Sequence, residues 1–156
     1  MIITYITGNL LKSPHRLILH GCNAQGVMGS GVAKAIRAKY PLAYEIYRKK
    51  YECDGLLLGE VVYAYISSEN LWIANGISQE YYGRIEKTYV DYEAINSIIT
   101  NVNSFAHKHG IDEVAMPLIG AGLGGGSWKI ISNEIEKCFV AVQPIVYVLD
   151  GIIPSN

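Results

Sequence analysis

Residues 17–36 read LILHGCNAQGVMGSGVAKAI, and this stretch joins an apolar run to a helix-like run through a glycine-rich segment without charge. The run at 16–21 (RLILHG) is nearly all apolar, as in a strand covered on both faces of a sheet. The run that starts near Gly31 has apolar residues at helical spacing and stops at Pro41, which cannot continue a helix. The stretch therefore predicts a buried strand, a glycine loop and a helix, in that order.

Strand-like and helix-like segments alternate along the rest of the chain. We predict further strands at 1–6, 59–66, 71–75, 113–119 and 144–150, and further helices at 42–51, 91–109 and 128–139. Interleaved strands and helices imply an α/β fold with helices on both faces of a sheet. The opening strands and the hairpin turn SSEN (67–70) predict a sheet that is mixed and mostly parallel.

Composition narrows the class of protein. The 156 residues, half of them hydrophobic, predict one domain over 1–156 with its own core. A net charge of −1 argues against a strong electrostatic grip on nucleic acid or on an anionic membrane. The three cysteines are scattered, which indicates neither a disulfide framework nor a zinc site, and no apolar run reaches the ~18 residues of a membrane span. We expect a soluble, cytoplasmic protein.

A second glycine loop, GAGLGGGSW (120–128), is placed like the first, after a predicted strand and before a predicted helix. Ligands of α/β sheets bind outside the carboxyl ends of strands, where such loops meet. Successive N–H groups and the positive end of a helix can hold an anion there. Tight turns would explain the glycines of one loop equally well, but two equivalent loops favour a clamp for a diphosphate.

Two other nucleotide motifs fit less well. Gly120, Gly122 and Gly125 satisfy G-x-G-x-x-G, and the next predicted strand ends at Asp150, which would suggest a nicotinamide or flavin dinucleotide. That fingerprint belongs to the first βαβ unit of a long sheet, whereas the sequence ends shortly after Asp150. Neither loop has the Gly-Lys-Ser/Thr step of a P-loop. We therefore expect no dinucleotide cofactor.

The motifs GNLL (8–11), HGCNAQGVMGSGVA (20–33) and MPLIGAGLGGGSW (116–128) resemble the ADP-ribose-binding loops of the macrodomain family. The length of the chain and the order of its elements resemble that family too. The resemblance is strongest to the branch of ADP-ribose-1″-phosphate phosphatases, terminal ADP-ribose glycohydrolases and antitoxins that remove ADP-ribose from DNA. It implies a three-layer α/β/α fold whose cleft holds ADP-ribose, with the diphosphate between the two glycine loops.

The resemblance also implies binding positions. Gly8, Asn9 and Leu10 match the adenine loop, and Asn9 stands where many macrodomains have an Asp. Cys22 and Asn23 match positions beside the distal ribose, with Asn23 placed to bond its hydroxyls. The positions that match the two phosphate loops are Val27, Met28, Gly29, Ser30, Gly31 and Val32 in the first, and Pro117, Ile119, Gly120, Ala121, Gly122, Leu123 and Gly124 in the second.

The glycohydrolases of this branch use a Lys after the middle hairpin, and some add an Asp in the second glycine loop. Gln79 lies near the Lys position here, and Gly124 occupies that of the Asp. Arg84 cannot give up its proton to act as a base, and Lys87 lies several residues late. We also expect a tyrosine of QEYYGR (79–84) to cover the distal ribose.

His20 directly precedes GCN, where the phosphatases of the family carry a His near the terminal phosphate. An imidazole can attack phosphorus, or assist water and protonate the leaving oxygen. The alternatives are a buried, satisfied His20 and a nucleophile pair with Cys22. The leading hypothesis is an ADP-ribose-1″-phosphate phosphatase with His20 catalytic and without metal or cofactor. An ADP-ribosyl glycohydrolase acting on protein or nucleic acid, and a non-catalytic ADP-ribose-binding module, are the alternatives.

Overall fold

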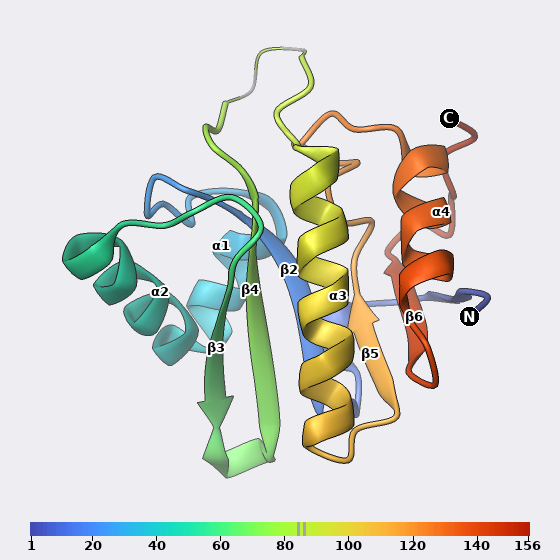
Figure 1. Ribbon diagram of the computed structural model, residues 1–156, viewed down its shortest axis with the longest axis horizontal. Helices are drawn as coiled ribbons and strands as arrows, with labels where there is room; N and C mark the ends of the chain where they lie inside the picture. Colours follow the sequence, from blue (N-terminus) through green and yellow to red (C-terminus); the bar gives the residue numbers. More distant parts are fainter. Residues whose placement is uncertain (84, 86) are drawn as a thin grey trace.

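The computed structural model describes residues 1–83, 85 and 87–156, and its strands form one sheet in the order β1-β6-β5-β2-β4-β3 (Figure 1). The strands are β1 (Thr4–Thr7), β2 (Leu17–Asn23), β3 (Val61–Ile66), β4 (Leu71–Gln79), β5 (Glu113–Met116) and β6 (Gln143–Val148). β3 runs antiparallel to β4, and the other neighbouring strands are parallel. The expectation of a mixed, mostly parallel sheet is confirmed.

The mixed character comes from the β3–β4 hairpin and not from the opening strands. β1 lies at one edge of the sheet and β2 at its centre, with β6 and β5 between them. The segment that joins β1 to β2 contains a single 3-10 turn, η1 (Leu10–Lys12). A second such turn, η2 (Ser67–Glu69), closes the hairpin.

Two helices cover each face of the sheet (Figure 1). α1 (Gly31–Lys39) and α2 (Pro41–Asp54) pack on one face, where Ile36 and Ala43 join the core. α3 (Tyr92–Lys108) and α4 (Trp128–Cys138) pack on the other. The result is a three-layer α/β/α sandwich. No helix in the described ranges is long and apolar enough to cross a membrane.

The central strand β2 explains why its sequence is so apolar. Leu17 and Leu19 enter the core beneath α3 and α4, whereas Ile18 enters the core beneath α1 and α2. Because side chains alternate along a strand, His20 and Cys22 fall on the same side as Ile18. Both faces of β2 are therefore buried, and His20 lies on the face that α2 covers.

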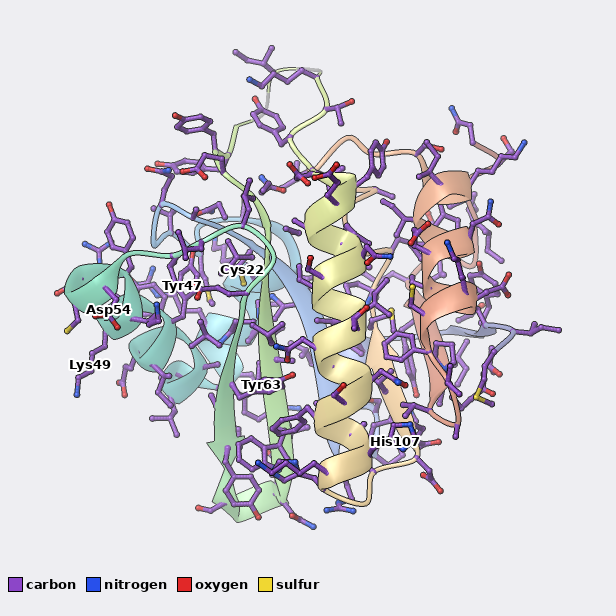
Figure 2. The ribbon with its side chains drawn as sticks, viewed as in Figure 1. Cys22, Tyr47, Lys49, Asp54, Tyr63 and His107 are labelled. Atoms are coloured by element: carbon purple, nitrogen blue, oxygen red, sulfur yellow. The ribbon has the colours of Figure 1, made fainter. Side chains whose placement is uncertain are left out.

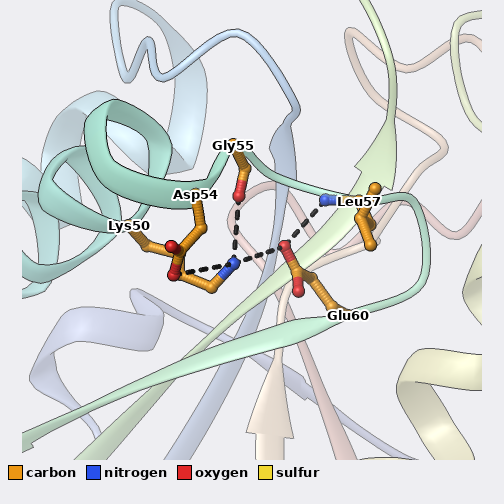
Figure 3. Close-up of polar contacts among 5 residues, drawn as sticks. All are labelled: Lys50, Asp54, Gly55, Leu57 and Glu60. Carbon is orange, nitrogen blue, oxygen red and sulfur yellow. Dashed lines mark hydrogen bonds and ion pairs between the residues drawn. The ribbon is translucent and has the colours of Figure 1, made fainter.

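A polar cluster around Lys50 joins the end of α2 to β3 (Figure 3). Lys50 Nζ donates to the carbonyl oxygen of Gly55 at 3.0 Å and pairs with Glu60 at 3.5 Å and Asp54 at 3.9 Å. Glu60 also accepts from the backbone N–H of Leu57 at 2.7 Å. These partly exposed contacts are individually weak, but together they anchor the loop that follows α2.

Candidate functional site

One cleft of about 530 Å³ opens at the carboxyl ends of β2, β4 and β5. Its walls are the loop from β2 to α1 and the loop from β5 to α4, as the glycine patterns predict. The expected binding residues that line it are Cys22, Asn23, Val27, 29–32, Pro117, Ile119, Gly120 and 122–124. The tertiary structure thus brings the two glycine loops together around one space.

The first turn of α1 forms part of this wall, and its N–H groups are left open. Ser30 is the N-cap of α1 in an extended conformation, but its side chain makes no capping hydrogen bond. By contrast, Asp91 caps α3 and Ser127 caps α4 through their side chains. Gly31 lines the cleft together with the next two residues of α1. Open N–H groups at the positive end of a helix dipole favour an anion.

The glycines of the second loop fall into two kinds. A Cβ on Gly124 or Gly126 would lie 2.7 or 2.8 Å from the carbonyl oxygen of Gly120, and Gly125 has a φ of +68° that favours glycine. These glycines are required by the turn itself. Gly122 is different, because a Cβ there would meet no atom of the described residues within 4 Å. Its bare backbone faces open space in the cleft and not a packed neighbour.

Asn23 organises the first loop. Its Oδ1 accepts from the backbone N–H groups of Gln25 at 3.0 Å and Val27 at 3.3 Å, and its Nδ2 donates to the carbonyl oxygen of Val27 at 2.8 Å. Tyr47 reaches from α2 towards the end of β2 near Cys22 (Figure 2) and donates to the Asn23 carbonyl at 2.6 Å. Since the Asn23 Oδ1 is already engaged, only its second amide hydrogen remains for a ribose hydroxyl.

His20, the expected catalytic residue, is not among the residues that line the cleft. The side chain is fully buried, and its Nε2–H donates to Asn75 Oδ1 at 2.5 Å. Cys22, two residues closer to the carboxyl end of β2, lines the cleft and lies 3.6 Å from the same nitrogen. Alternation along β2 places both side chains in the layer between the sheet and α2, and His20 lies deeper in that layer because it is further from the end of the strand.

Burial also keeps this pair of side chains neutral. Desolvation lowers the pKa of His20 to about 4, although the bond to Asn75 opposes the shift. Desolvation raises the pKa of the Cys22 thiol. Asn75 holds the ring in place, because its Nδ2 donates to the carbonyl oxygen of Ala43 at 3.2 Å. The two groups are therefore in contact, but this arrangement favours neither a thiolate nor an imidazolium.

The expected adenine loop and two other expected positions lie elsewhere. Gly8, Asn9 and Leu10 do not line the cleft; Asn9 Oδ1 caps η1 by accepting from the N–H of Leu11 at 2.9 Å, and Leu10 is buried in the core. Met28 is buried beneath the first loop, and Ala121 packs against the core below the second.

No described residue that lines the cleft is Asp, Glu, Lys, Arg or His. Gln79 does line it, and its Nε2 donates to the carbonyl oxygen of Tyr81 at 2.7 Å. Lys87 lies over the ring of Tyr89 at 4.7 Å and is not part of the lining. Arg84 lies outside the described residues. Across the described chain, no group of three His, Cys, Asp or Glu side chains could hold a metal ion.

Sequence reasoning missed one polar side chain of the cleft, and the reason is the length of β4. The predicted strand stops at Asn75, whereas β4 continues to Gln79. The extra residues carry Ser78 into the lining, beside Tyr82 and Gly83 of the expected tyrosine segment. The run LWIANGIS was the signal, because its apolar residues resume after Asn75 and Gly76 at Ile77, as in a strand covered on both faces.

A three-layer α/β/α sandwich with two glycine loops around one cleft is the architecture of a macrodomain. The chain belongs to that family, because the Macro domain family matches residues 19–134.

Named relatives include two kinds of enzyme. The chain is 27% identical to the ADP-ribose 1″-phosphate phosphatase of Debaryomyces hansenii, over 96% of this chain and 100% of that protein. It is 22% identical to the DNA ADP-ribosyl glycohydrolase of Thermus aquaticus, over 92% of this chain but only 39% of that longer protein. The macrodomain of Mycobacterium tuberculosis DarG superposes with a TM-score of 0.83 at 22% identity, covering 94% of this chain and 97% of the other. That last likeness shows the fold.

Proposed function

We propose that this chain binds ADP-ribose in the cleft and releases phosphate from ADP-ribose 1″-phosphate. The observation that carries the binding proposal is the open N-terminus of α1, which faces the second glycine loop across the cleft. Gly122 offers bare backbone on the opposite side. Backbone N–H groups and a helix dipole suit a diphosphate where the described lining residues include no basic side chain.

The choice of the terminal phosphate rests on charge. A phosphate at C1″ of the distal ribose would be an anion, and a carboxylate beside it would repel it. The end of the cleft at β4 presents Ser78, Gln79 and Tyr82, which are neutral hydrogen-bonding groups. A glycohydrolase base is harder to accommodate, because Gly124 has no room for a side chain. The likeness to the Debaryomyces phosphatase over the whole of both chains supports the same choice.

His20 enters this proposal as a positioning residue that supports Cys22 from below. The ring contacts Cys22 and Asn75, and it does not reach the cleft. The sequence-based hypothesis gave His20 direct contact with the phosphate. The two roles are separable, because a ring that attacks phosphorus or shuttles a proton would give the rate a His-like pH dependence, whereas a neutral support would not.

The test measures phosphate release from ADP-ribose 1″-phosphate and, by calorimetry, the binding of ADP-ribose. We expect the wild-type protein to do both. His20→Gln should bind ADP-ribose and release phosphate at a reduced rate, with the same pH profile as wild type between pH 5.5 and 8. Abolished release with unchanged binding, together with loss of a titration seen in the wild type, would instead assign the reaction to His20.

A non-catalytic ADP-ribose-binding module is the second candidate, and it is favoured because all described side chains of the lining are neutral. Binding of ADP-ribose without release of phosphate would establish that function. Removal of ADP-ribose from a modified protein or DNA strand would instead establish a glycohydrolase and direct attention to Gln79 and Lys87.

A further inference from the structure

The end of the cleft at β4 contains a buried hydroxyl that makes no hydrogen bond to the described residues. Ser78 is 1% exposed and lines the cleft. Within the described residues its side chain makes no hydrogen bond, although its own carbonyl oxygen accepts from the N–H of Asp91 at 2.8 Å. A buried hydroxyl that meets only the cleft lacks a partner until a ligand enters.

The neighbouring strand leaves space for this hydroxyl. Gly21 lies on β2 beside Ser78, and a Cβ at Gly21 would come within 2.6 Å of Ser78 Oγ and 3.4 Å of Ile119. Gly21 is not one of the glycines with a positive φ, so its backbone conformation does not require glycine. The missing side chain therefore serves the packing around Ser78. A side chain at position 21 would push the hydroxyl out of its place.

The order of the strands sets which part of a ligand Ser78 meets. The two glycine loops follow β2 and β5, which are neighbours, and β4 lies on the other side of β2. The GNLL loop follows β1 at the far edge of the sheet beyond β5 and β6. The GNLL residues do not line the cleft, whereas Ser78, Gln79 and Tyr82 do. In the proposed complex the distal ribose therefore enters the end at β4, and the adenine extends towards β1 beyond the lining.

We infer that Ser78 donates a hydrogen bond to the group on C1″ of the distal ribose and selects ligands that carry a phosphate there. This inference rests on the proposed function, because it takes ADP-ribose as the ligand. A hydroxyl suits this position, since it can donate to a phosphate oxygen without adding charge. Gly21 belongs to the same site, because its missing side chain leaves the space that the Ser78 hydroxyl occupies.

The test compares three probes on the wild-type protein and on Ser78→Ala. Binding of ADP and of ADP-ribose is measured by calorimetry. Because the proposed activity consumes ADP-ribose 1″-phosphate, its affinity is taken from the KM of phosphate release, or from calorimetry if no phosphate is released. We use ADP because it lacks the distal ribose. We expect Ser78→Ala to bind ADP as wild type does and to bind ADP-ribose 1″-phosphate about ten- to a hundredfold more weakly, the usual effect of losing a hydrogen bond to a charged group. Ser132→Ala, which removes a hydroxyl from α4 outside the cleft, is the matched control and should change nothing.

Gly21→Ala gives a second, independent variant, because it keeps Ser78 and displaces its hydroxyl. It should show the same selective loss for the 1″-phosphate. Equal losses for all three probes would mean that Ser78 only supports the fold of the cleft, and unchanged affinities would mean that it touches no ligand; either result overturns the inference. A wild-type protein that binds none of the probes would overturn the proposed function, and the inference with it. If the wild-type protein binds the probes but neither variant loses affinity selectively for ADP-ribose 1″-phosphate, the inference is overturned and the proposed function is not.

Discussion

The hydroxyl of Tyr47 donates to the backbone carbonyl oxygen of Asn23 at 2.6 Å and lies 3.0 Å from its Oδ1. Tyr47 is fully buried, and burial raises the pKa of its hydroxyl, so it stays protonated and can donate. The bond ties α2 to the start of the first glycine loop. The shape of that loop therefore depends on a helix that does not itself line the cleft.

Replacing Tyr47 with Phe should loosen the first loop. The buried Asn23 carbonyl would lose its donor, which lowers the free energy of unfolding by about 1–2 kcal/mol. ADP-ribose affinity should fall as well, because Asn23 holds the N–H groups of the loop in position. Urea unfolding and calorimetry measure the two effects. Tyr44→Phe is the control, since the Tyr44 hydroxyl makes no hydrogen bond to the described residues; equal effects in both variants would contradict the argument.

Gly122→Glu should abolish ADP-ribose binding without disturbing the fold. A Cβ at this position would meet no described protein atom within 4 Å, so a side chain can start there without a clash. In the proposed site its carboxylate would repel the diphosphate and occupy part of its space. Calorimetry measures binding, and thermal unfolding should show an unchanged midpoint. Gly122→Gln separates charge from volume, and should bind more strongly than Gly122→Glu; normal binding by the Glu variant would show that the diphosphate lies elsewhere.

Replacing Gly124 with Ala should destabilise the fold more than replacing Gly122 with Ala. Gly124→Ala should lower the free energy of unfolding by about 1–3 kcal/mol, because its Cβ would lie 2.7 Å from the Gly120 carbonyl oxygen. Gly122→Ala should change it by less than about 0.5 kcal/mol. Chemical denaturation of the two variants checks this. Similar values for both would mean that the loop shifts to accept a side chain at 124, and that the Asp of the glycohydrolases would fit there too.

The lowered pKa of His20 should make the free energy of unfolding depend on pH. Its pKa is about 4 in the folded chain against 6.5 for the ordinary side chain, so below pH 6.5 the unfolded state binds a proton that the folded state excludes. The stability contributed by neutral His20 is therefore complete above pH 6.5 and is lost as the pH falls towards 4. The full loss corresponds to roughly 3 kcal/mol.

The variant His20→Gln isolates this effect, because it keeps a donor for Asn75 but cannot titrate. Between pH 7 and pH 4.5, the wild-type free energy of unfolding should fall by roughly 2–3 kcal/mol more than that of His20→Gln. Urea unfolding at a series of pH values provides the measurement. Parallel curves for the two proteins would show that His20 reaches solvent and takes up its proton in the folded state.

Much of the fold follows from local patterns. The apolar β2 run, the glycine loops and the helical spacing that stops before Pro41 each depend on residues close in sequence, and they predict the α/β class and the position of the cleft. The predicted ends of the strands were less accurate than the predicted strands themselves. β5 stops at Met116, before Pro117, which has no N–H to continue a ladder. β4 runs on to Gln79 because Asn75 and Gly76 are covered by helices and can stay in the sheet.

The sequence by itself determined that two bare loops each follow a strand and precede a helix, because glycine and apolar periodicity act locally on the backbone. Only the tertiary structure decided which side chains meet the cleft. His20 and Ser78 both stand near the ends of central strands, yet His20 is packed under α2 against Asn75 while Ser78 opens to the cleft beside Gly21. That difference depends on which layer covers each face of the sheet and on which neighbour lacks a side chain, and both are set by residues far away in the chain.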